Sequence, residues 1–488
     1  MDGISEVQKA QLQEVADLML DIYQTLAGMR YLDPRGIQSG PHDITELRPL
    51  YEQHGLDPSV IHLYSILPYV DTAAAGNEDF FHGGTFTDFR IEDDVEQGRD
   101  PFYGGPTEED FEDEDGPYMR PWVTPLSRLG NHDSVIVYDA RKHRIWIIDQ
   151  ESGCSTDPAL EGVEEETPKS KNRNNFDHIP SRPAGDALRD IARWYRELEE
   201  LPGGGEYSGG EWSPDLGLKG MYQKHGWPDN FNGGAFQVDQ ARAYCADRVK
   251  YRAEEPLREV EKYRDWKKWN GRTIEDRQKA LAAAKSTDEE WMTRLELWDA
   301  EQSYRRNTKE LEKAEQEANR LCPDGVCSKS EDLPLLELDV IREEYESKKR
   351  QVEAERNWME ESIESDPERA EGFRISLYHT QKEEEIYRKA WEAARADADR
   401  LCPGRTLDSV IELDDSEQQS MAEVQRMEGF IMYLELELAA LQEWATQIPE
   451  DAPKTKDKVN SKMEDYERAM EDHQARLATL KATLRSQL

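Results

Sequence analysis

The chain has little of what a secreted, membrane-spanning or disulfide-stabilised protein needs. It has only five cysteines in 488 residues. That number is too low for a disulfide framework, and its oddness leaves at least one thiol outside any intrachain pair. No stretch approaches the ~20 consecutive apolar residues of a membrane helix. The start, MDGISEVQKAQ, lacks the basic segment and apolar run of a signal peptide. We therefore expect a cytoplasmic protein in a reducing compartment, with no membrane association.

Apolar residues are also scarce. They make up 36% of the chain, charged residues make up 34%, and the formal net charge is -42. Such a chain must keep much of its surface in water, which suits thin helical bundles better than one large globule. Its length predicts about two to four folding units. The negative charge repels phosphate, so nucleic acid and anionic membranes are not expected partners, whereas a basic protein or mimicry of nucleic acid is compatible with it.

Recognisable catalytic and cofactor signatures are missing as well. The sequence has no G-x-S-x-G, no phosphate-binding loop ending in Lys-Ser or Lys-Thr, and no H-E-x-x-H. The acidic run Glu108–Asp115 could bind calcium, but Gly116 at the sixth position of an EF-hand loop would put Phe111, which cannot be a ligand, first. We interpret the run as a solvated loop and expect no metal and no cofactor.

What is present in the first part of the chain predicts an α+β domain with a small antiparallel sheet. Two β-rich runs, 134–139 and 144–149, flank a four-residue turn and predict a hairpin. Both runs are almost entirely apolar, so we expect both faces of the sheet to be covered. Helical spacing of apolar residues predicts helices at 4–32, 44–54, 58–65 and 183–201.

The expected boundaries follow changes in composition. We assign 1–150 to the α+β domain with its acidic loop and 151–183 to a linker or disordered insertion, because that segment is polar and contains proline. Residues 184–235 hold a helix and a loop rich in Trp and Gly that completes the domain, and 236–488 form an acidic helical array.

The order of elements from Ile61 to Trp212 resembles the SUKH superfamily, which includes fungal cell-wall-synthesis regulators and bacterial toxin-immunity proteins. Leu67-Pro68, Trp122-Val-Thr-Pro-Leu126, the hairpin, and the helix around Trp194 and Leu198 carry this resemblance. It implies an α+β module that binds other proteins and has no catalytic residues.

Heptad spacing dominates the second half and predicts an elongated array of antiparallel, coiled-coil-like helices. One stripe comprises Leu297, Ala300, Tyr304, Asn307, Leu311, Ala314, Ala318 and Leu321, and similar stripes cover 424–448 and 463–484. An internal repeat accompanies them, because residues 317–323 (EANRLCP) match residues 397–403 (DADRLCP). We interpret the repeat as two copies of a helix–turn–helix unit. Cys322 and Cys327 could close a disulfide or simply mark the end of a helix.

These patterns indicate a class of function and no specific activity. We favour a non-enzymatic scaffold or regulatory protein that binds a protein partner or a second copy of itself. The alternative is an enzyme or small-molecule binder with its site between the hairpin and the Trp-rich loop. Weak catalytic candidates there are His132 and Asp133, and weak ligand-binding candidates are Trp212 and Trp227.

Overall fold

The computed structural model describes residues 4–102, 118–128, 134–149, 151–164, 172, 174–205, 209–327, 332–363, 365–405 and 416–487. They form two compact units. The first unit comprises Met1–Asp247 and Ile341–Ala393, and the second comprises Arg248–Val340 and Ala394–Leu488. The prediction of an α+β region followed by a helical array is confirmed. Part of that array, 341–393, belongs with the α+β region, which heptad spacing did not indicate.

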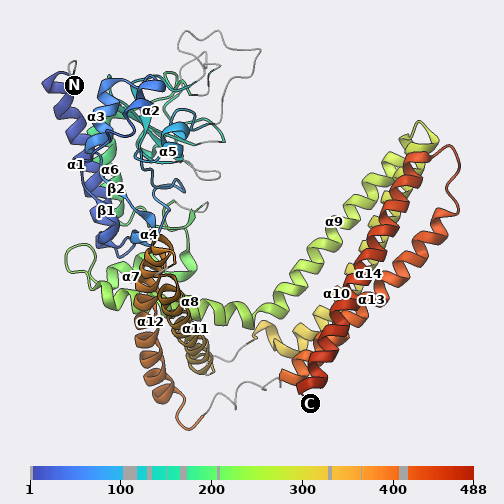
Figure 1. Cartoon of the computed structure of the whole chain (residues 1–488). Helices are drawn as coiled ribbons and strands as arrows, with labels where there is room; N and C mark the ends of the chain where they lie inside the picture. Colours follow the sequence, from blue (N-terminus) through green and yellow to red (C-terminus); the bar gives the residue numbers. More distant parts are fainter. Residues whose placement is uncertain are drawn as a thin grey trace. The chain divides into compact units, whose positions relative to one another are not determined.

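The elements are named as in Figure 1. The first half contains α1 (Glu6–Gly28), β1 (Ile37–Gln38), α2 (Arg48–Gln53), α3 (Pro58–Ile66), β2 (Tyr69–Val70), α4 (Thr72–Ala75), α5 (Glu92–Gln97), β3 (Val123–Pro125), β4 (Ser134–Asp139), β5 (Arg144–Asp149), β6 (Arg182–Pro183), α6 (Ala184–Glu197) and α7 (Leu218–Lys224). The second half contains α8 (Gly233–Ala253), α9 (Glu255–Ala283), α10 (Thr287–Leu321), α11 (Leu333–Ser362), α12 (Pro367–Leu401), α13 (Ser416–Ala445) and α14 (Pro453–Gln487).

The larger sheet is antiparallel in the order β3-β4-β5-β6, with Val137 opposite Trp146 in the central pair. The predicted hairpin is confirmed at both of its strands. Alternate residues of a strand point to opposite faces, so Ile136 and Ile147 enter one hydrophobic core while Val135 and Ile148 enter another. All four side chains are fully buried, which explains why both runs are apolar.

The first of these cores is formed with helices. Leu12, Val15, Met19, Ile22 and Leu26 of α1 recur at helical spacing, are almost inaccessible to solvent, and pack with the buried face of α6. The prediction of helices in these regions is confirmed, although α2 is shorter than the segment 44–54. Gly55, just after α2, has φ of +64°, the left-handed conformation expected of a residue that ends a helix.

The second core includes part of 151–183, the segment expected to be a linker. Phe176 and Ile179 are buried in it, and the Trp146 indole donates a hydrogen bond of 3.0 Å to the Ile179 carbonyl. Arg182 lies in β6 and donates hydrogen bonds to the carboxylates of Asp157, at 2.7 Å, and Asp190, at 2.5 Å. The described part of this segment therefore covers one face and one edge of the sheet. The acidic run 108–115 lies outside the described residues.

The second unit is built from paired long helices. Helices α9 and α10 run side by side, as do α13 and α14, and α10 also contacts α14 (Figure 1). Leu295 of α10, Leu441 of α13 and Val459 of α14 form one small core. Of the heptad positions predicted in α10, Ala300, Asn307, Leu311 and Ala318 are buried. Among the described residues, no helix is both long enough and apolar enough to cross a bilayer.

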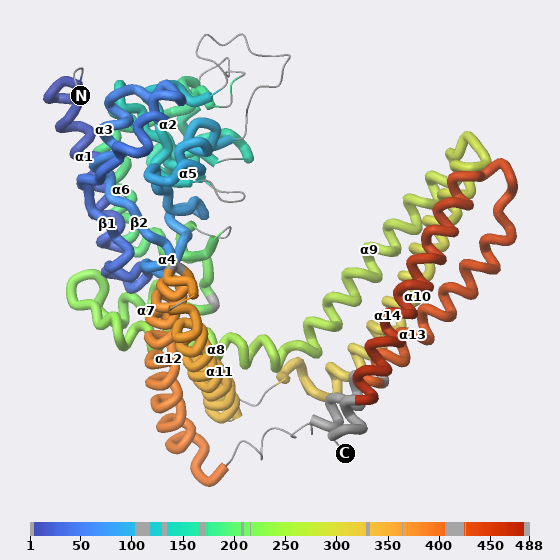
Figure 2. Tube along the Cα trace, in the orientation of Figure 1, coloured from blue at the N-terminus to red at the C-terminus, as the bar shows by residue number. Residues whose placement is uncertain are grey.

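Helices α11 and α12 form a hairpin that approaches α4 (Figure 2). The ammonium group of Lys382 lies 2.8 Å from an Asp33 carboxylate oxygen, and the Arg35 guanidinium lies 3.1 Å from the centre of the Tyr378 ring. His379 Nε2 lies 3.1 Å from the Ala74 carbonyl oxygen. These polar contacts join residues 341–393 to the α+β part of the first unit.

The two copies of the proposed repeat end alike. The Cys322 amide donates to the Ala318 carbonyl, and the Cys402 amide donates to the Ala398 carbonyl, each at 2.8 Å, so α10 and α12 stop at equivalent residues. Cys322 is joined to Cys327 by a disulfide across the turn at Pro323–Gly325. Position 402 has no cysteine five residues later.

Candidate interaction groove

The catalytic candidates from the sequence are His132 and Asp133, and both lie outside the described residues. Their neighbour His143 is described and serves to join elements. Its Nδ1 lies 3.1 Å from the Tyr138 hydroxyl, and its Nε2 lies 3.1 Å from a Glu14 carboxylate oxygen. These two hydrogen bonds connect α1 to the hairpin. Burial raises the pKa of the Tyr138 hydroxyl.

The two tryptophans proposed for ligand binding pack into the first unit. The Trp212 indole N–H donates a hydrogen bond of 3.3 Å to the Pro202 carbonyl. Its ring packs against Gly204 so closely that a Cβ atom at that residue would lie 2.7 Å from the ring. The Trp227 indole donates 3.1 Å to the Arg196 carbonyl, and its ring contacts Tyr222. Each indole N–H is hydrogen-bonded to a backbone carbonyl, so both side chains are part of the packing of the first unit in this structure.

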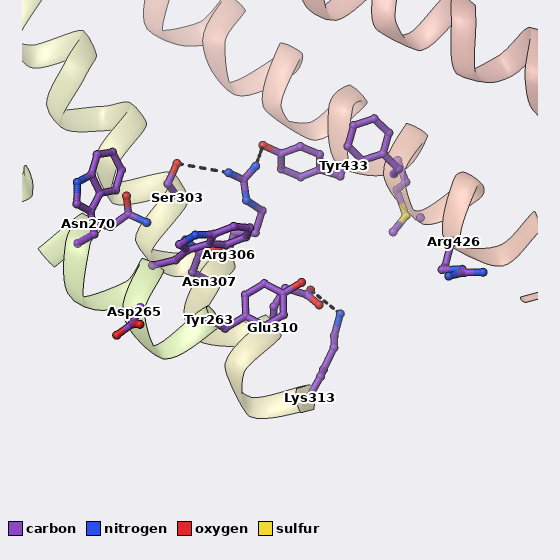
Figure 3. Close-up of a pocket in the computed structure, with 15 residues that line it drawn as sticks. Tyr263, Asp265, Asn270, Ser303, Arg306, Asn307, Glu310, Lys313, Arg426 and Tyr433 are labelled. Carbon is purple, nitrogen blue, oxygen red and sulfur yellow. Dashed lines mark hydrogen bonds and ion pairs between the residues drawn. The ribbon is translucent and has the colours of Figure 1, made fainter. Parts of the chain in front are cut away.

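A groove of about 1420 Å³ lies within the second unit, between α9, α10 and α13 (Figure 3). Aromatic side chains from two of these helices line it. Trp266 and Trp269 of α9 are 49% and 65% exposed, and Phe430 and Met432 of α13 are 42% and 59% exposed. Large apolar side chains are normally buried, and an exposed group of them commonly marks a binding surface.

Helix periodicity places these tryptophans. The buried face of α9 packs on α10 through Val260, which contacts the core of Leu311 and Ala318. Trp266 and Trp269 are three residues apart and so lie on one face of the helix. The side chain of Tyr263, between core and groove, makes an edge-to-face contact with Trp266 at 5.6 Å between ring centres.

The floor of the groove is polar. Arg306 reaches from α10 to the hydroxyls of Tyr433 and Ser303, and Lys313 pairs with Glu310 at 2.7 Å (Figure 3). Asn270 and Asn307 also line the groove, with residue exposures of 2% and 7%. Their amides make no hydrogen bond with other described side chains. Two nearly buried amides facing a groove offer donors and acceptors to an occupant.

Beside the floor, a cluster of ionisable groups connects α10, α13 and α14. Lys462 of α14 pairs with Asp299 of α10. Burial raises the pKa of Glu437 on α13, and Asp299 adds to this, while Arg306 and Lys462 oppose it. Burial also raises the pKa of Tyr433, although Arg306 acts against it. The cluster positions Arg306 under the groove.

A second groove, of about 960 Å³, lies within the first unit beside α4 and α12. Its polar groups are largely used within the chain. Lys382 pairs with Asp33, and Lys348 pairs with Glu383 at 2.5 Å. Ser376 donates 2.9 Å to the buried carboxylate of Glu355. This groove belongs to the packing of the helical hairpin and leaves fewer groups for an outside molecule.

No cluster of three or more His, Cys, Asp or Glu side chains that could hold a metal is found in the part of the chain that the structure describes. Comparisons with protein-family models, with curated proteins and with solved structures each found no match to this chain. Function is therefore inferred from the geometry of the groove.

Sequence reasoning missed the groove because it treated the second half as uniformly acidic. A signal was present in 262–272, KYRDWKKWNGR, which carries five basic residues, one acidic residue and two tryptophans. Exposed tryptophans do not fit a heptad core, and this local reversal of charge could have directed attention to α9.

Proposed function

We propose that this chain is a non-enzymatic interaction protein whose second unit binds a helix of a partner protein in the groove between α9, α10 and α13. The observation that carries the proposal is the pair Trp266 and Trp269, half-exposed on one face of α9 opposite Phe430 and Met432. Helix-in-groove recognition uses apolar anchors spaced along one face of the incoming helix. Tryptophan is among the residues that most often contribute strongly to binding.

The shape and composition of the groove support an extended apolar occupant with polar edges. Aromatic side chains of α9 and α13 line it, together with polar side chains such as Ser303, Arg306 and Asn307 of α10. The resemblance of 61–212 to the SUKH superfamily supports the same class of function, since it too implies a module that binds proteins. A cytoplasmic location stays a prediction from the sequence.

The test compares wild-type chain with the double variant Trp266→Ala/Trp269→Ala. Binding of fluorescein-labelled amphipathic helical peptides is measured by anisotropy, with the full chain as titrant. We expect the double variant to bind at least one apolar-striped peptide about 30-fold more weakly, the effect of losing ~2 kcal/mol of anchor contacts. Both side chains are about half exposed, so the variant should unfold within a few degrees of wild type.

Trp358→Ala is the matched control, because Trp358 is 50% exposed on α11, outside the groove. It should leave peptide affinity unchanged. Equal affinities of wild type and the double variant for every peptide would remove the basis of the proposal.

A further inference from the structure

The face of α9 that carries the tryptophans is basic in a chain of net charge -42. Lys262, Trp266, Trp269 and Arg272 are spaced by four, three and three residues, so they form one stripe along the helix. The Lys262 ammonium lies 5.2 Å from the Trp266 ring centre. The aromatic anchors are thus bracketed by a cation at each end.

Cations line the groove itself from α10 and α13. Arg306 and Lys313 come from α10 and Arg426 from α13, against Asp265 and Glu310 as the acidic lining residues. The whole chain has 62 basic and 104 acidic residues, so an excess of basic groups here is a local reversal.

Several of these cations are committed within the chain, and two are not. Lys262 pairs with Glu259 at 2.5 Å, and Lys313 pairs with Glu310. Arg272 and Arg426 are exposed and make no ion pair with other described residues. Figure 3 shows the Arg426 guanidinium apart from the Arg306 and Lys313 groups. Arg426 lines the groove from α13, and Arg272 lies on α9 three residues beyond Trp269, next to the lining. Guanidiniums in these positions suit carboxylates at the edges of an occupant.

From this arrangement we infer that the groove takes an acidic amphipathic helix of a partner protein, with its apolar stripe on the tryptophans and its carboxylates on Arg272 and Arg426. This rests on the proposed function. It also differs from what net charge implies, because a chain of -42 favours a basic partner at long range. Within about one Debye length, ~10 Å at 0.1 M salt, the groove's own charges decide the preference.

A nucleic acid is the less suitable anionic occupant. Its affinity depends on many cations meeting successive phosphates. Among the described residues that line the groove, Arg426 is the one cation without an ion pair or hydrogen bond, and the chain around it is acidic. A helix needs only a few carboxylates beside an apolar stripe, which the aromatic walls accommodate.

The experiment uses the full chain and two synthetic helical peptides of about 20 residues, or roughly 30 Å. Both peptides carry the same apolar stripe of leucine and phenylalanine. The remaining positions are mostly glutamate in one peptide and mostly lysine in the other. Anisotropy is measured at about 0.05 M and about 0.5 M salt, which shortens the screening length several-fold. For each peptide, the measured quantity is the ratio of its affinity for wild type to its affinity for Trp266→Ala/Trp269→Ala. This ratio is used because a lysine-rich peptide also binds non-specifically to the acidic surface of the chain.

The expected result is a tryptophan-dependent affinity at least about tenfold greater for the acidic peptide. Arg272→Glu/Arg426→Glu should weaken acidic-peptide binding about tenfold or more in low salt and much less in high salt, as expected for screened ion pairs. Arg350→Glu/Arg476→Glu, at exposed positions on α11 and α14, is the matched control and should have little effect.

Other outcomes separate this inference from the proposed function. If both peptides bind with equal dependence on the tryptophans, the acidic preference is wrong and the groove still binds helices. If neither does, both proposals fail. Tryptophan-dependent binding of a single-stranded oligonucleotide that displaces the peptide, or tryptophan-dependent self-association of the chain in light scattering, would replace the acidic partner helix with another occupant.

Discussion

The ammonium nitrogen of Lys382 lies 2.8 Å from a carboxylate oxygen of Asp33, although the two residues are 349 positions apart in the chain. Asp33 is 7% exposed and ends the loop after α1, while Lys382 lies on α12. The same carboxylate accepts hydrogen bonds from the Arg35 amide and guanidinium at 3.0 and 3.1 Å. This pair is a principal contact between α12 and the α+β part of the first unit.

Replacing Lys382 with alanine should weaken the packing of α12. It removes the ammonium partner of a buried carboxylate, and hydrogen bonds to charged groups contribute about 1.5–3 kcal/mol each. We expect a loss of this size in the free energy of opening, measured as faster amide hydrogen exchange across 370–393. Lys389→Ala is the control, because Lys389 forms an exposed pair with Glu385 on the same helix and should change exchange little. Equal protection in the two variants would show that the Asp33 contact does not hold α12.

The same carboxylate should make stability depend on pH in the acid range. Burial alone would raise the pKa of Asp33, but hydrogen bonds from Lys382 and Arg35 prevail and hold it well below its ordinary value. A carboxyl group with a lowered folded-state pKa contributes stability that is complete above its unfolded pKa, about 4, and is lost as pH falls through the folded pKa. Asp33→Asn should therefore be less stable than wild type at pH 7, and the difference should shrink below about pH 4. Denaturant unfolding at several pH values measures it, and a constant difference across the range would contradict this assignment.

Glu437 should show the opposite dependence. Burial raises its pKa, so the ionised form is disfavoured in the folded state. Stability is then lost as pH rises through the raised pKa and is regained when the carboxyl is protonated. We expect Glu437→Gln to raise the melting temperature at pH 7 and to match wild type near pH 4, the region of the ordinary glutamate pKa. The exposed neighbour Glu435 provides the control substitution, and a Gln variant that melts lower at pH 7 would mean that the carboxylate makes favourable contacts.

The disulfide between Cys322 and Cys327 can be tested directly. Its loop spans five positions, and closing so short a loop restricts the unfolded chain by about 2 kcal/mol. Alkylation of the native protein without reductant, followed by mass spectrometry, should label Cys154, a partly exposed thiol, and leave both cysteines of the pair unlabelled. Reductant should lower the melting temperature of wild type and leave that of Cys322→Ser/Cys327→Ser unchanged. Labelling of all three residues without reductant would show that the pair is reduced, as the expected reducing compartment implies.

Local features of the chain were predictable because they depend on neighbours in sequence. β-branched and aromatic residues on either side of a short turn determine the hairpin at 134–149, and the glycine at position 55 and the Cys-Pro breaks determine where helices end. The groove was not predictable in the same way. Its walls come from α9 and α13, which are separated by more than one hundred residues.

By itself, the sequence determined the helices, the hairpin, the acidic charge and the division into α+β and helical regions, since propensity, periodicity and composition are local properties. Only the tertiary structure decided which helices pair, because heptad stripes of similar composition can pack against one another in many combinations. It placed Lys382 on Asp33, covered both faces of the sheet, and left Trp266 and Trp269 exposed in a groove whose Arg426 has no ion pair among the described residues. Those outcomes depend on tertiary packing, because few arrangements of the helices bury their apolar faces and also pair charges that are distant in the sequence.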